Sequence, residues 1–87
     1  MQRNVYSVKD KPTGMLMNPF VEVNDATAVR AMIDLIRNQK DHAFAQHSGD
    51  FILVKLGTFD DVKGIIGEDD YQKIMEIRDI KESLEDG

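Results

Sequence analysis

Few side chains in this chain could carry out chemistry by themselves. The 87 residues include no cysteine and only two histidines, His42 and His47. A spacing of five separates two imidazoles widely in angle on a helix, so they do not converge as metal ligands must. The acidic clusters at 60–61 and 68–70 lack the alternating ligands and distal glutamate of a calcium loop, and turn formation and helix capping explain them. We therefore expect no bound metal.

The sequence also lacks the short motifs of common enzymes. It contains no phosphate-binding loop of the G-x-x-x-x-G-K-[ST] type, no dinucleotide-binding G-x-G-x-x-G and no G-x-S-x-G. Without cysteine, and with two histidines, nucleophilic catalysis has few candidates. We expect a protein that is not an enzyme and needs no cofactor.

Charge is distributed unevenly along the chain. The net charge is −5. Residues 1–59 hold seven Lys/Arg against six Asp/Glu, which gives +1, and residues 60–87 hold four against ten, which gives −6. The near-neutral first part leaves nucleic-acid binding open, whereas a uniformly acidic protein would bind nucleic acid poorly.

Basic and aromatic residues are interleaved in that first part, as in proteins that hold single-stranded nucleic acid in a basic groove with bases stacked on aromatic rings. The other interpretation is that the aromatics form the core and the bases are solvated, and composition alone favours it. The candidate nucleic-acid-binding residues are Arg3, Tyr6, Lys9, Lys11, Phe20, Arg30, Arg37, Lys40, Phe51 and Lys55, and Phe59 is a further strand aromatic.

One amphipathic helix is predicted over residues 24–38. Val29, Met32, Ile33 and Ile36 recur at i, i+3, i+4 and i+7, and Asn24 or Asp25 supplies the N-cap. Strands are predicted at 4–9, 20–23, 51–58 and from 65, with turns at 11–14 and 60–64, and 42–47 is a candidate helical turn with Phe44 packed inward. We expect the helix to pack on Ile52, Val54 and Leu56.

The acidic C-terminal part is predicted to be a second helix over residues 68–84. Its apolar seam consists of Ile74, Ile77, Ile80 and Leu84, with Tyr71 beside it. This seam is either folded back on its own chain or the interface of a homodimer, and we favour the homodimer because short chains gain core by associating. The expected fold is α+β: a mostly antiparallel β-β-α-β-β core at 1–67 with the helix at 68–87 in the same domain.

No targeting segment is recognisable. No apolar run reaches the roughly 20 residues that cross a membrane, and the N-terminus lacks the apolar core of a signal peptide. We expect a cytoplasmic protein without membrane contact.

Three segments resemble the small nonstructural protein of gokushoviruses, the single-stranded DNA phages of the family Microviridae. They are VYSVKD from Val5, PFVEVNDATAVRAMIDLI from Pro19 and HSGDFILVKLGTFDDVKG from His47. The chain departs from the family at Ser48-Gly49, where Pro-Glu is usual, and at 39–46, which lacks Asp-Pro-Arg. The helix after Gly67 matches no family segment.

The resemblance implies a nonstructural protein that is made in the cytoplasm of the infected bacterium and is absent from the capsid. Proteins of this kind are described as DNA-binding, or as assisting the switch from duplex replication to single-strand synthesis and packaging. Two hypotheses follow. The chain binds single-stranded DNA or the replication complex, or it docks a host or phage replication protein through its acidic C-terminal helix.

Overall fold

The computed structural model describes the backbone of residues 2–85 and the side chains of 2–67 and 71–84. Within that part the chain forms one antiparallel sheet of four strands in the order β2-β1-β3-β4. The α+β fold with a small antiparallel sheet is thus confirmed. In chain order the elements are β1 (Gln2–Asp10), β2 (Phe20–Glu22), α1 (Asp25–Asn38), α2 (Ala43–Gln46), a 3-10 turn (Ser48–Asp50), β3 (Phe51–Asp60), β4 (Ile65–Glu76) and α3 (Ile77–Glu85).

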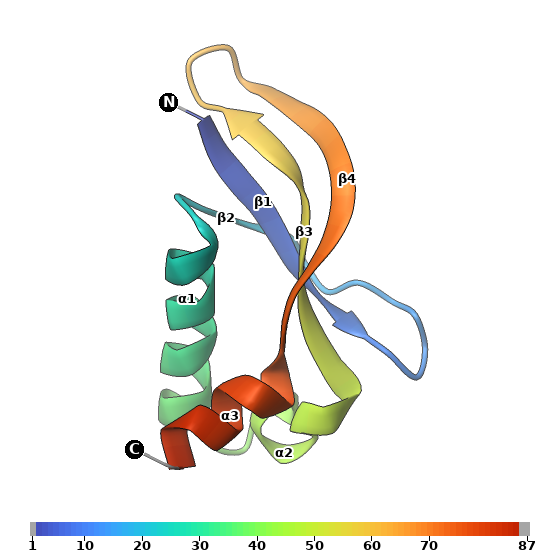
Figure 1. The fold of residues 1–87 in the computed structure, drawn as a ribbon, viewed down its shortest axis with the longest axis vertical. Coiled ribbons are helices and arrows are strands. Elements are labelled where there is room, and N and C mark those ends of the chain that lie inside the picture. Colours follow the sequence, from blue (N-terminus) through green and yellow to red (C-terminus); the bar gives the residue numbers. More distant parts are fainter. Residues whose placement is uncertain (1, 86–87) are drawn as a thin grey trace.

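All three helices lie on the same side of the sheet (Figure 1). The core fills the space between the two layers. Its buried members are Tyr6, Val8, Ala28, Met32, Ile36, Phe44, Ala45, Phe51, Leu53, Ile77 and Ile80. The tip of the β3–β4 hairpin projects beyond the helices, so the sheet is covered at one end only (Figure 1).

Helix α1 begins where the sequence predicted. Asn24 is its N-cap and forms a capping box, in which Thr27 N donates to Asn24 Oδ1 at 2.9 Å and Asn24 N donates to Thr27 Oγ1 at 3.2 Å. Met32 and Ile36 are buried as expected, whereas Val29 and Ile33 are only partly buried. The predicted helical turn is also present as α2, and Phe44 is buried in the core.

The predicted packing of α1 on Ile52, Val54 and Leu56 is wrong. Phe51 and Leu53 share the core cluster with the helices. Ile52 and Val54 are buried too, but they point to the opposite face of the sheet, because successive strand residues alternate between faces. Leu56 lies at a register shift between Lys55 and Gly57 and is only partly buried. Because β3 has apolar residues on both faces, the sequence does not determine which face packs against α1.

The predicted helix over 68–84 is wrong for residues 68–76, which belong to β4. Gln72, Lys73 and Met75 pair with Lys55, Val54 and Leu53, and α3 begins only at Ile77. Ile74 lies on β4, whereas the other residues of the predicted apolar seam lie on α3. The seam therefore spans a junction between a strand and a helix. Long-range pairing to the central strand outweighs helical propensity here.

The C-terminal helix folds back on its own chain. Ile77 and Ile80 are fully buried in the core, whereas Leu84 and the strand residue Ile74 pack at its edge and Tyr71 is exposed. Of the residues assigned to a homodimer interface, the two central isoleucines are thus inaccessible in the folded chain. The alternative of a monomer with the helix folded back accounts for their burial.

A polar contact joins the sheet to the start of α1. The Tyr6 hydroxyl donates to Asp25 Oδ1 at 2.5 Å and accepts from Asn4 Nδ2 at 2.9 Å. Burial, and then the hydrogen bond to Asp25, raise the pKa of Tyr6 to about 12. The neutral phenol is therefore favoured by folding, and its contribution to stability is present below the ordinary tyrosine pKa and lost as pH rises towards about 12.

This linkage gives a measurable pH dependence. Between about pH 9 and pH 12, ionisation of Tyr6 should lower the free energy of unfolding by on the order of 2 kcal/mol. Tyr6→Phe should be less stable than the wild type at neutral pH, because a buried hydrogen bond is lost, and the gap should narrow with rising pH. Urea denaturation at a series of pH values measures this gap. Tyr71→Phe changes an exposed tyrosine, and its free energy of unfolding should depend on pH as that of the wild type does. If the difference in free energy of unfolding between the wild type and Tyr6→Phe stayed constant with pH, the linkage would be refuted.

Candidate nucleic-acid interface

The sheet has one face that no helix covers (Figure 1). Directly paired residues of antiparallel strands point to the same face, so the register assigns its members. Three rows run across it: Lys9, Ile52 and Glu76; Ser7, Val54 and Lys73; and Arg3, Phe59 and Ile66. We call this set, together with Lys11 and Tyr71, the open face.

Two lysines lie across the central strand on the open face. Lys9 Nζ sits 5.6 Å from the ring centroid of Tyr71 on β4, and Lys11 Nζ donates to Glu76 Oε2 at 2.8 Å. Lys9 and Lys11 come from the β1 side of β3, and their partners lie on β4. Their side chains therefore cross β3, on which Ile52 and Val54 are buried.

Aromatic and cationic groups are neighbours on this surface. Tyr71 is 45% exposed and carries the Lys9 ammonium over its ring. Phe59 is partly buried between Arg3 and Ile66 in the register, and Lys73 is exposed opposite Val54. A cation over an exposed aromatic ring, with further cations on neighbouring strands, can hold a phosphate chain and stack a base.

Two of the cations already have carboxylate partners. Lys11 pairs with Glu76, and Arg3 Nε lies 3.6 Å from Asp61 Oδ2. Both pairs are substantially exposed, and exposed pairs of this kind contribute little free energy. A polyanion could therefore exchange with the carboxylates at small cost, whereas Lys9 and Lys73 have no carboxylate within ion-pair distance among the described side chains.

The predicted nucleic-acid-binding residues do not form one site. Arg3, Lys9 and Lys11 are together on the open face, whereas Arg30, Arg37 and Lys40 are exposed in the helical layer on the other side of the sheet. Lys55 pairs with Tyr6 and so points to the helical side.

The three predicted aromatics lie on the helical side as well. Tyr6 and Phe51 are buried in the core, and Phe20 is stacked on Tyr6 with ring centroids 5.9 Å apart. Tyr6 and Phe51 cannot stack a base in the folded chain, so their assignment to a binding surface is wrong and their interpretation as core residues is correct. Phe20 is only partly buried, and its assignment stays a prediction.

The open face contains three residues that sequence reasoning did not assign to nucleic acid. The sequence pattern predicts Tyr71 at a helical interface and Lys73 within the acidic helix, and it indicates Phe59 only as a strand aromatic. Tyr71 and Lys73 are two residues apart, which is the period of a strand, but a register shift between Leu53 and Val54 places Met75 opposite Leu53 on the helical side.

The structure offers no alternative metal centre or membrane segment in the part that it describes. No group of three histidine, cysteine or carboxylate side chains is close enough to hold a metal ion among those residues. None of the helices there has both the length and the apolar character that a membrane span requires.

Fold and surface together define a small α+β protein whose antiparallel sheet is backed by helices on one face and is basic and aromatic on the other. Residues 3–81 match the family model described as phage ORF5 protein. The chain belongs to this family and is a bacteriophage protein. No curated protein and no solved structure matches it.

Proposed function

We propose that this chain is a gokushovirus nonstructural protein that binds single-stranded viral DNA on the open face during genome synthesis and packaging in the host cytoplasm. Membership of a phage family supports the viral origin. The segments from Val5, Pro19 and His47 support the narrower assignment to gokushoviruses. The observation that carries the DNA-binding proposal is the exposed Tyr71 ring beneath the Lys9 ammonium on the uncovered side of the sheet.

The arrangement suits a single strand better than a duplex. A base can stack on Tyr71 only if its own face is free, and in a duplex that face is covered by neighbouring bases. Lys9, now over the ring, would swing aside to meet a phosphate while the base takes its place. Lys73 and Arg3, on the flanking strands, would contact the preceding and following phosphates, so the backbone would cross the strands.

Fluorescence anisotropy with a labelled oligothymidylate tests this proposal. Lys9→Gln and Lys73→Gln should each weaken binding and lower the slope of log K against log salt by about 1, as expected for one lost phosphate contact. Tyr71→Ala should cost about 1–3 kcal/mol of binding free energy with the slope nearly unchanged, because stacking does not release counterions.

The matched control is Arg78→Gln, which removes one positive charge from an exposed position on α3 in the helical layer. It should leave affinity and salt slope close to those of the wild type. If Arg78→Gln weakens binding as much as Lys73→Gln, the interaction is a general charge effect and the open face is not the site. Absence of any anisotropy change at about 50 mM salt rejects DNA binding altogether.

The second candidate function, docking of a replication protein, is favoured by the outward side of α3. Asp79 and Glu82 are exposed there, whereas Ile77 and Ile80 on the inward side are fixed in the core. An acidic helical surface held rigidly by its own core suits a basic partner surface. Charge reversal at Asp79 and Glu82 should abolish such docking and leave oligonucleotide binding intact.

A further inference from the structure

The ion pairs between described side chains all have their cation on the open face. Asp61 pairs with Arg3, and Glu76 pairs with Lys11. Both carboxylates come from the β3–β4 hairpin, Asp61 from its turn and Glu76 from the last position of β4. Acidic side chains of this hairpin therefore contact cations on the same surface as the proposed DNA site.

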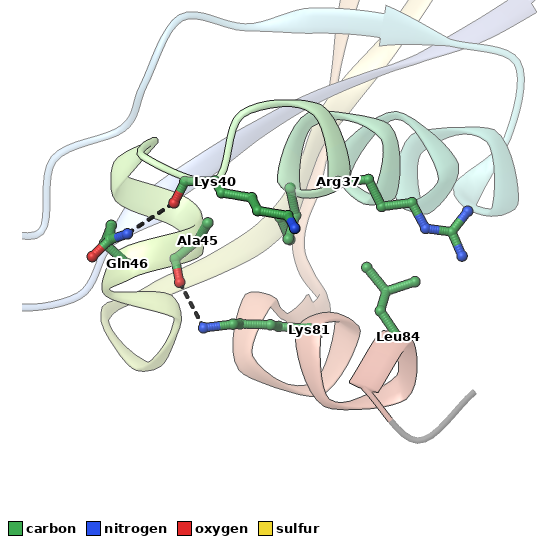
Figure 2. A pocket seen from close by; sticks show the side chains of 7 residues that line it. Arg37, Lys40, Ala45, Gln46, Lys81 and Leu84 are labelled. Carbon is green, nitrogen blue, oxygen red and sulfur yellow. Dashed lines mark hydrogen bonds between the residues drawn. The ribbon is translucent and has the colours of Figure 1, made fainter.

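The cations of the helical layer are arranged differently. Arg37, Lys40 and Lys81 line an open pocket between the three helices, and none of its described lining residues is acidic. The Arg37 guanidinium points away from the two lysines, and Lys81 Nζ donates to the Ala45 carbonyl oxygen at 2.9 Å (Figure 2). These cations do not converge on one place. Competition between a carboxylate and a phosphate for the same cation is thus expected on the open face.

The backbone fixes the positions from which Lys11 and Glu76 meet. Lys11 N donates to the Asp50 carbonyl oxygen at 2.8 Å, and Glu76 pairs with Ile52 in the register. Asp50 directly precedes β3 and Ile52 is its second residue, so both partners are attached to the same end of the central strand. Lys11 Nζ then donates to Glu76 Oε2 at 2.8 Å. The sheet therefore sets this contact before any DNA arrives.

The Glu76 carboxylate is close to two cations of the open face. It accepts from Lys11, and it shares a row of the sheet with Lys9. A lysine ammonium is a compact single charge, so a phosphate gains its full attraction to Lys11 only when the carboxylate has left. The Lys11 and Glu76 side chains are 41% and 31% exposed, so solvent reaches the pair and can replace either partner.

We propose that Glu76 is an intramolecular competitor that occupies Lys11 and thereby sets the affinity of the open face for single-stranded DNA. This inference rests on the proposed function of the open face. A phosphate must displace the Glu76 carboxylate to reach Lys11, and the free energy of the ion pair is lost from the free energy of binding. Because an exposed pair is weak, the carboxylate lowers the affinity without abolishing binding, and a bound strand stays exchangeable.

Glu76→Gln tests this competition, because it removes the charge and keeps the size of the side chain. In the anisotropy assay with oligothymidylate, it should bind about two- to fivefold more tightly than the wild type, as the free energy of an exposed ion pair allows. Glu82→Gln is the matched control, since it removes the same charge from an exposed position of α3 in the helical layer. It should bind as the wild type does, and both variants should melt near the wild-type temperature.

A double-mutant cycle with Lys11→Gln shows whether Glu76 acts through Lys11. In the Lys11→Gln background the carboxylate has no cation to occupy there, so the gain from Glu76→Gln should fall to the level of Glu82→Gln. If the gain persists undiminished in that background, Glu76 acts by general repulsion of phosphates, and the proposed competition is wrong.

The remaining outcomes separate this inference from the proposed function. If Glu76→Gln binds no more tightly while Lys73→Gln still weakens binding, the open face remains the DNA site and the competition is refuted. An equal gain for Glu76→Gln and Glu82→Gln also refutes it, because only net charge would then matter. If neither the wild type nor Glu76→Gln changes the anisotropy at about 50 mM salt, the proposed function and this inference fail together.

Discussion

Replacement of Leu53 by alanine should destabilise the protein by about 2–5 kcal/mol, the range for large-to-small changes at fully buried aliphatic positions. Leu53 is on the central strand, is fully buried, and belongs to the cluster that joins the sheet to the helices. Tyr6, Ile77 and Ile80 in the same cluster are fully buried as well, so the surrounding core has little freedom to relax into the cavity. Urea denaturation followed by circular dichroism measures the loss.

Val62→Ala is the comparison for this variant. Val62 is 82% exposed in the turn between β3 and β4. Its truncation should change stability by less than about 0.5 kcal/mol. A Leu53→Ala loss as small as that of Val62→Ala would mean that the helical layer does not cover this face of β3.

The second large effect is expected on α3. Ile80→Asp places a carboxylate at a fully buried position in the core, where it has no cationic partner among the core residues. An unpaired buried charge costs several kcal/mol, which is comparable to the whole stability of a small domain. We expect the variant to lose its cooperative thermal transition.

Arg78→Asp is the matched control for Ile80→Asp, because it adds an aspartate to an exposed position of the same helix. It should unfold cooperatively near the wild-type temperature. The experiment also tests how α3 is used. If α3 were released from its own chain and formed a dimer interface, Ile80→Asp would yield a folded monomer in sedimentation equilibrium. A folded monomeric variant would therefore contradict the burial of α3 within its own core.

Elements with local signals could be predicted from the sequence. Helix α1 has its apolar period and its Asn24–Thr27 cap within fifteen residues, and Gly14 and Gly64 take the positive φ angles that the predicted turns require. The end of β4 could not be predicted, because residues 72–76 are held in a strand by pairing with β3. The paired residues are 17 to 24 positions apart, and the register shift between Leu53 and Val54 interrupts the strand period within this segment.

The candidate binding surface could be predicted only in part. The sequence indicates positive charge at Lys9 and Lys11, but composition does not reveal the face of a sheet to which an aromatic side chain points. The candidate aromatics Tyr6 and Phe51 therefore lie in the core, whereas Phe59 and Tyr71 lie on the open face. The deciding information is the register of β1, β3 and β4, which requires all three strands to be placed together.

The position of β1 between β2 and β3 has a consequence for the order of folding. Its pairing with β2 spans a short loop, but its partners on β3 lie 41 positions away at Asp10–Phe51 and 58 positions away at Gln2–Asp60. A nascent chain can form the β1–β2 pair and α1 before β3, which carries the buried Phe51 and Leu53, has been synthesised. Pairs this far apart in sequence raise the contact order, and a higher contact order is associated with slower folding. The apolar side chains of β1 and α1 thus stay without their partners on β3 until residues 51–60 have been synthesised.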